Sequence, residues 1–94
     1  LNHTFKSTSV HKFINIRRMA VSALGKIGSI KGETILIRAL EDENSQVVTY
    51  AIKALKKLKS TKAKEKIIYI KNKNDKDYIL KAVDEYLQEI DDPI

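Results

Sequence analysis

The stretch INIRRMAVSALGKIGSIKGETILIRALEDE, residues 14–43, decides the fold. Its apolar residues Ile16, Ala20, Ala23, Leu24 and Ile27 follow at spacings that place them in one stripe on a helix of 3.6 residues per turn. A shorter apolar set at residues 35–40 follows, and it ends in the polar run 41–45. The stretch therefore predicts two successive helices, over about 16–28 and about 33–41.

Residues at the borders of these segments support the same boundaries. Asn15 can cap the start of the first helix, and Gly28 can end it in a left-handed turn. Asn44 or Ser45 can cap a third helix, and Asp75 or Asp77 a fifth. Pro93 stops any extension of that last helix.

A shift of 31 residues aligns the quoted stretch with the rest of the chain. One column of this alignment holds Ala20, Ala51 and Ala82, and the next holds Val21, Ile52 and Val83. The repetition predicts three more helices, over about 46–59, 63–71 and 76–90. We expect the three alanines to mark sites where neighbouring helices approach closely, because a larger side chain would not fit there.

Short connections between these segments force neighbouring helices to run antiparallel. We predict an all-α fold, an α-α superhelix (solenoid) of about two and a half helix pairs, with about five helices. The repeat domain spans 14–94, with units at about 15–44, 45–74 and 75–91. Residues 1–13 are either the truncated end of a preceding repeat or a disordered lead-in.

The composition excludes several classes of protein. The 94 residues contain no cysteine, so disulfides, thiolate nucleophiles and zinc–sulfur sites are ruled out. No apolar run approaches the roughly 20 residues that span a bilayer. Because secretory features and cysteine are missing, we expect a cytoplasmic protein.

Positive charge is concentrated in the middle of the chain, whose net charge is +6. The lysine-rich block, residues 53–73, contains nine lysines and a single acidic residue, Glu65. Such a block either attracts a polyanion or forms a solvated surface. The block has no arginine, and we expect its one aromatic residue, Tyr69, to be packed rather than free to stack on a base.

The quoted stretch resembles a HEAT repeat of the short, phycobilisome-lyase type. The resemblance is carried by Ile16-Arg17, Ala20, Ala23-Leu24-Gly25, Ile27-Gly28 and Leu40-x-Asp42. It implies that Arg17 and Asp42 belong to a structural ladder of polar contacts between repeats. Val48 replaces the arginine in the second unit, which leaves Asp42 free there. The third unit resembles a terminal cap, because its last helix carries many polar residues.

Other motifs have a plain structural interpretation. The glycines of GKIG, residues 25–28, match the clamp of KH domains, but no segment has the alternation of a strand, so we interpret them as a helix end. His3 and His11 lack a third metal ligand, and no metal site or cofactor is expected. The acidic pairs Asp91-Asp92 and Asp75 with Asp77 lie at predicted helix ends, where capping explains them. Asn2 begins a glycosylation triplet without other signs of secretion. The tyrosines are taken as core residues; they are Tyr50, Tyr69, Tyr78 and Tyr86.

We therefore predict a non-enzymatic binding module or scaffold. By the resemblance, the first helices of the units form a concave face that binds a partner protein. The outward positions of this face are Arg18, Ser22, Lys26, Thr49, Lys53, Lys57, Lys81 and Gln88. Five of these eight are basic, so the partner should have an acidic surface. The alternatives are nucleic-acid binding through the same basic face and an accessory role in a larger enzyme or lyase-like complex. No membrane and no small-molecule substrate is expected.

Overall fold

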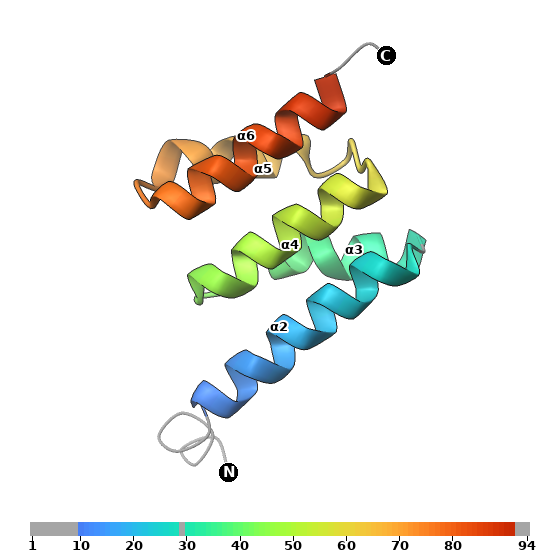
Figure 1. The fold of residues 1–94 in the computed structure, drawn as a ribbon, viewed down its shortest axis with the longest axis vertical. Coiled ribbons are helices and arrows are strands. Elements are labelled where there is room, and N and C mark those ends of the chain that lie inside the picture. The colour runs from blue at the N-terminus through green and yellow to red at the C-terminus, as the bar shows by residue number, and fades with distance from the viewer. Residues whose placement is uncertain (1–9, 29, 92–94) are drawn as a thin grey trace.

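The computed structural model describes residues 10–28 and 30–91. Its five helices are α2 (Val10–Ile27), α3 (Ile30–Ala39), α4 (Ser45–Leu58), α5 (Lys64–Lys73) and α6 (Asp77–Asp91). In Figure 1, α2, α4 and α6 lie side by side in one layer, and α3 and α5 lie behind them in a second layer. The described ranges contain helices and turns but no strand, so the all-α solenoid with five helices is confirmed.

The core lies between the two layers. Buried residues that the 31-residue shift aligns with one another form much of it. Val21, Ile52 and Val83 share one column and are all buried, as are Leu36 and Ile67 in another. α4 packs against α2 on one side and α6 on the other, with α3 behind it. Burial of each such aliphatic side chain stabilises the fold by about 1.5–3 kcal/mol.

Tyr86 takes the place of a leucine in the third unit and is fully buried. Its hydroxyl donates a hydrogen bond to the backbone oxygen of Ser60, in the connection between α4 and α5. Burial raises the pKa of the Tyr86 phenol to about 12, with smaller contributions from the charges of Asp91 and Glu33. The phenol therefore stays neutral at physiological pH and ties α6 to that connection.

The predicted start of the first helix was wrong. α2 begins at Val10, six residues earlier than predicted, and Asn15 lies inside the helix instead of capping it. Residues 10–13 are thus continuous with the first helix of the first unit and are not the second helix of a preceding one. Residues 1–9, to which the rest of that expectation refers, lie outside the described residues.

Ala51 and Ala82 are buried where neighbouring helices meet, as predicted, but Ala20 is exposed. Its side of α2 faces away from α4, and within the described residues no helix packs against it. The closest approach involves Gly25 instead, since a Cβ atom built there would lie 2.6 Å from Ala54 Cβ. α2 and α4 can meet at this point only because residue 25 has no side chain.

Equivalent helix ends in the first two units share a left-handed backbone. Gly28 follows α2 with φ 70°, and Lys59, 31 residues later, follows α4 with φ 54°. Glycine adopts this conformation without steric cost, whereas an L-residue with a side chain is strained there by about 1–2 kcal/mol. The second unit therefore keeps the left-handed turn, but with a lysine in place of the glycine that adopts it without strain.

We expect Gly25→Ala to lower the free energy of unfolding by about 1–3 kcal/mol, because the added methyl group overpacks the contact with Ala54. Chemical denaturation followed by circular dichroism measures this loss. Ser22→Ala, on the same helix, serves as the control and should change stability by less than about 0.5 kcal/mol. A Gly25→Ala variant as stable as the parent would show that α2 and α4 do not approach this closely.

We expect Lys59→Gly to raise the free energy of unfolding by about 0.5–1 kcal/mol, since strain is relieved and part of the gain is offset by the entropy of glycine in the unfolded chain. Thermal denaturation measures the change. Lys57→Gly, in the exposed part of α4, should instead lower stability by about 1 kcal/mol. A loss of stability in both variants would contradict the left-handed assignment of Lys59.

Candidate functional site

The candidate site is the exposed side of α2, α4 and α6, which we call the front face. Seven of the eight residues predicted for it are exposed or half-buried: Arg18, Ser22, Lys26, Lys53, Lys57, Lys81 and Gln88. They come from three helices, and their helical register places them on the layer of Figure 1 that lies opposite α3 and α5. Five of these seven residues are basic, while Asp84 of α6, which is exposed and shares the column of Ser22 and Lys53, is acidic.

Thr49 was wrongly predicted for this face. It is buried, and its hydroxyl donates a hydrogen bond of 2.8 Å to the backbone oxygen of Ser45. Thr49 shares its column with Arg18, which is only half-buried. Arg18 also lies against a neighbouring helix, since it contacts Gln46 and Tyr50 of α4, so the difference comes from the side chains: the short threonine bonds its own helix, whereas the long arginine stays partly exposed.

Tyr50 belongs to the front face, although the sequence analysis placed it in the core. Its ring is exposed, with the Arg18 guanidinium carbon 5.7 Å and Lys53 Nζ 5.9 Å from the ring centre. Arg18 also donates a hydrogen bond of 2.9 Å to Gln46. The column of Tyr50 contains Lys81, and a lysine in that column was the available signal that the position is exposed.

A pocket of about 290 Å³ opens on the front face between α2 and α4. It is lined by Ser22, Gly25, Tyr50, Lys53, Ala54, Lys56, Lys57 and Glu85. Three of these residues are lysines and one is acidic, so the pocket favours a negatively charged group. A second, more open hollow of about 500 Å³ lies near the start of α4, but its lining has one lysine and one glutamate and no concentrated charge.

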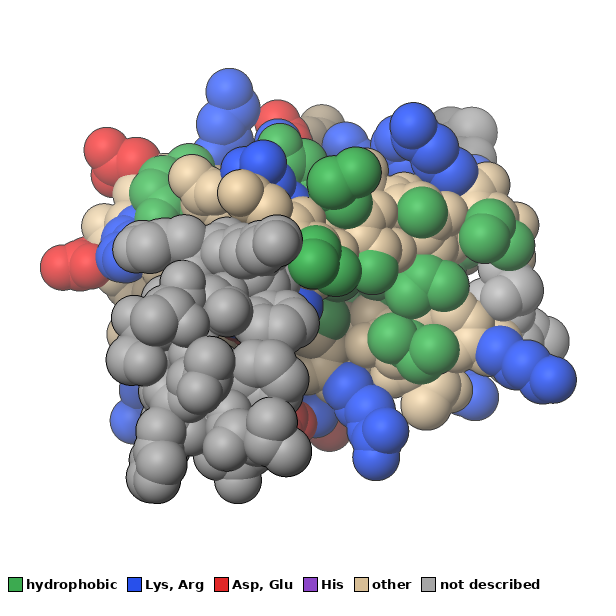
Figure 2. Space-filling view, turned by 90° about the horizontal axis from the view of Figure 1, so that it is seen from below, with side chains coloured by type: hydrophobic (Ala, Val, Ile, Leu, Met, Phe, Trp, Pro, Cys, Tyr) green, Lys and Arg blue, Asp and Glu red, His purple; other side chains and the backbone are tan. Residues whose placement is uncertain are grey.

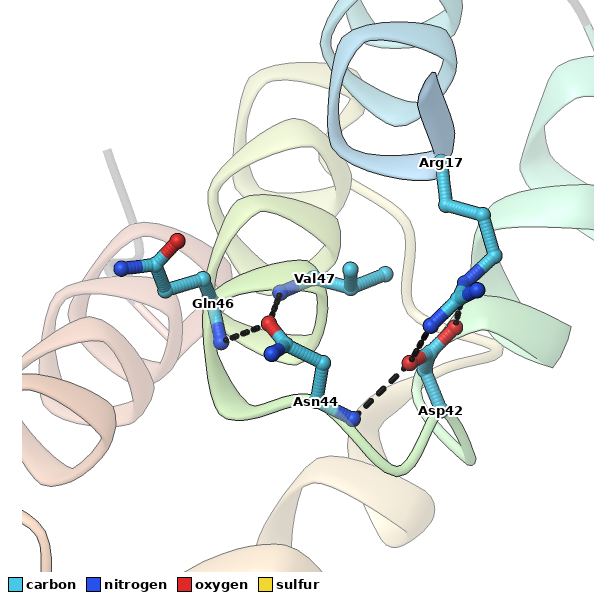
Figure 3. A network of polar contacts seen from close by, with 5 residues as sticks. All are labelled: Arg17, Asp42, Asn44, Gln46 and Val47. Carbon is cyan, nitrogen blue, oxygen red and sulfur yellow. Dashed lines mark hydrogen bonds and ion pairs between the residues drawn. The ribbon is translucent and has the colours of Figure 1, made fainter. Parts of the chain in front are cut away.

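The predicted contact between Arg17 and Asp42 is present and links α2 to the turn before α4. Arg17 Nε donates to Asp42 Oδ2 at 2.6 Å, and Nη2 donates to Oδ1 at 3.0 Å. The same carboxylate accepts the backbone N–H of Asn44, whose side chain in turn accepts the N–H groups of Gln46 and Val47 at the start of α4. Figure 3 shows this connected set of contacts, through which Arg17 positions the N-terminus of α4.

Asp42 is fully engaged in this network, so the expectation that it is free was wrong. Partial burial raises the pKa of its carboxyl group, but the hydrogen bonds from Arg17 and Asn44 and the guanidinium charge outweigh that effect. The net pKa of Asp42 lies below 3.8, its ordinary value. In the later units the column of Arg17 holds Val48 and Ile79, both buried, so apolar packing replaces the polar contact there.

Several lysines of the lysine-rich block form ion pairs rather than a free surface. Lys59, Lys64 and Lys71 pair with acidic residues of α6, and Lys66 pairs with Glu41 after α3. Lys53, Lys56 and Lys57 lie instead at the front-face pocket. The block is therefore divided, and only its first part contributes to the candidate site.

Among the described residues, the other motifs lie at a helix end, in an ion pair or on exposed helix faces. Gly25 lies within α2 and Gly28 ends it, as predicted. The described residues hold no cluster of side chains suited to a metal ion, while His3, Asp92 and the side chain of His11 lie outside them. Asp91 is paired with Lys64.

Tyr69 and Tyr78 are exposed, contrary to prediction, and Lys73 Nζ lies 5.6 Å from the Tyr69 ring centre. In the described part of the chain, no helix is long and apolar enough to cross a membrane.

Stacked antiparallel helix pairs with a 31-residue period define an α-solenoid repeat protein. The family model for HEAT repeats matches residues 4–93, so the chain belongs to the HEAT-repeat family. No curated protein and no solved structure shows significant similarity to the chain. HEAT repeats generally mediate protein–protein interaction, and the family is typically non-enzymatic.

We expect Asp42→Asn to lower the free energy of unfolding at pH 7 by about 1–2 kcal/mol, discounted for the partial exposure of Arg17. Because the folded-state pKa of Asp42 is lowered, its contribution is complete above about pH 5 and is lost as the pH falls below 3.8. The difference between parent and variant should therefore shrink as the pH is lowered through the acidic range. Urea denaturation at a series of pH values measures it. Asp75→Asn, at an exposed site, is the control, and an equal effect there would contradict a specific role for Asp42.

Proposed function

We propose that this chain is a non-enzymatic protein-interaction module whose front face binds an acidic segment of a partner protein. The observation that carries the proposal is the position of the exposed cations on one layer of the solenoid. Arg18, Lys26, Lys53, Lys57 and Lys81 come from all three first helices, and together they create a positive potential over the front face.

The pocket between α2 and α4 gives this surface a point of specificity. Lys53, Lys56 and Lys57 surround it, and Gly25 and Ala54, where α2 and α4 meet, complete its lining between these helices. An aspartate or glutamate side chain entering the pocket would be attracted by these lysines, while Tyr50 offers an apolar and amphipathic contact beside them. We propose the partner as an acidic peptide segment that crosses from α2 to α4.

Two features support a protein partner over nucleic acid. Arg18 is the only arginine on the front face, although arginine is the better reader of phosphate and base edges. Its guanidinium lies near the Tyr50 ring and is hydrogen-bonded to Gln46. The cation and the exposed ring therefore already have contacts within the chain. A base that stacked on Tyr50 would have to displace this contact.

We expect Lys53→Glu/Lys57→Glu to weaken binding of a fluorescent peptide rich in Asp and Glu by about tenfold or more, since two attractive charges become repulsive. Fluorescence anisotropy at 150 mM salt measures the dissociation constant. The matched control is Lys62→Glu/Lys73→Glu, which changes the net charge equally at exposed positions outside the front face. The control should leave the affinity within about twofold.

Equal weakening by both double variants would show an effect of net charge alone and would contradict a site on the front face. A 20-base-pair DNA duplex provides the other comparison. Tighter binding of the duplex than of the peptide, with a steep loss of affinity in salt, would overturn the assignment in favour of nucleic acid.

A further inference from the structure

The side of α2 that faces away from α4 carries a stripe of apolar residues that nothing in the described structure covers. We call Ile16, Met19, Ala20, Ala23 and Ile27 the α2 stripe. The side chains of Ile16, Met19 and Ile27 are 52%, 69% and 69% exposed. Their spacing along the helix makes them one continuous surface, which is unusual for a solvated helix face.

Comparison with the next repeat unit shows which structural element packs against such a surface. One unit later, the equivalent residues of α4 are Val47, Tyr50, Ala51, Ala54 and Leu58, of which Val47, Ala51 and Ala54 are buried and Tyr50, at the edge of the stripe, is exposed. The buried residues are covered by α2, which meets them closely at Gly25 and Ala54. The α2 stripe has the same order of large and small side chains, so it is shaped to receive a helix.

α3 extends this surface. Ile35 is half exposed, and its equivalent in the next unit is Lys66, which reaches back to Glu41 of the preceding unit. Position 35 therefore faces the same end of the stack as the α2 stripe. Figure 2 looks at that end and shows hydrophobic side chains gathered there, with Lys and Arg side chains along their margins.

The charges around the stripe are basic. On α2, Lys26 is exposed and borders the stripe, whereas Arg17 is paired with Asp42 and Arg18 lies against α4. On α3, Lys31 and Arg38 are exposed and share a helix face with Ile35. An occupant of complementary charge would carry acidic residues along both margins of an apolar helix face.

A second copy of this chain does not offer such a helix. Two α2 stripes facing each other would bring like charges together. At the opposite end of the stack, Asp84 and Asp91 of α6 are already paired with Lys71 and Lys64. Three of the five acidic residues of α6, Asp84, Glu89 and Asp91, are thus engaged within their own copy.

We propose that the α2 stripe docks an amphipathic helix of a partner protein, with small and aliphatic residues facing Ala20 and Ala23 and with Asp or Glu at its margins. The helix lies against α2 as α2 lies against α4. This surface is separate from the front face, and binding there does not depend on the acidic segment proposed above.

Two synthetic helical peptides of 18 residues test this docking. Both carry the same Leu–Ala stripe, and one has Glu at the flanking positions where the other has Lys. We expect the Glu-flanked peptide to bind at least about tenfold more tightly by isothermal titration calorimetry. Ala20→Gln/Ala23→Gln should weaken that binding by about tenfold, because bulk and polarity block the close approach.

Asn15→Gln, at an exposed position of the same helix outside both the stripe and the front-face pocket, is the control and should bind as the parent does. Thermal melts confirm that the variants are folded. Equal affinity for the two peptides would contradict the proposal that the docked helix has acidic margins. Absence of binding by the Glu-flanked peptide at millimolar concentration would overturn the docking site itself. A dimer in sedimentation equilibrium that is lost in Ala20→Gln/Ala23→Gln would overturn it in favour of a second copy.

Discussion

The structure depends on the burial of α4 between its neighbours. Among the helices that the structure describes, only α4 has a first helix on each side, and its Ala51, Ile52 and Leu55 have no exposed surface at all. A helix of 14 residues is marginal alone in water, so this packing supplies what helix propensity does not. Once three sides of α4 are covered, the front is the only side where its lysines can remain hydrated. The exposed position of Lys53 and Lys57 on the front of α4 is thus a consequence of how α4 is packed.

Much of this arrangement could be predicted from the 31-residue columns. Residues in one column lie on the same side of their helices, because each repeat unit stacks on the next in the same way. The boundaries of α4, α5 and α6 therefore followed from the columns to within two residues. The start of α2 did not, because residues 10–13 have no counterpart that shows a first helix extended at its N-terminus. Asn15 was also a misleading signal, since a favoured capping residue is tolerated inside a helix.

The candidate site was predictable only where the environment of a column stays the same along the stack. Arg18 and Thr49 share a column, but the short Thr49 side chain is buried, whereas the longer Arg18 side chain, which lies against α4, stays partly exposed. Tyr50 shows the reverse error, since an aromatic residue at helical spacing was assigned to the core although Lys81 shares its column. A column gives direction, whereas burial depends on side-chain length and on whether a neighbour is present in that direction, as the exposed Ala20 and the buried Ala51 of one column show. The ends of a repeat stack are where the two differ.

The same distinction explains why the lysine-rich block could not be interpreted from its composition. Its nine lysines are chemically equivalent in the sequence, but the fold sends them to different surfaces. Lys64 and Lys71 lie on α5 within 3.1 Å of aspartates on α6, where each positive charge is offset by a negative one. Lys53 and Lys57 lie on the exposed side of α4, where the acidic residue at the pocket is Glu85. The potential that a partner meets is set by this difference, because paired charges largely cancel at distances beyond the Debye length of about 8–10 Å. The net charge of the block is therefore a poor measure of its attraction for an acidic partner, and the excess of cations over anions on a single face is the relevant quantity.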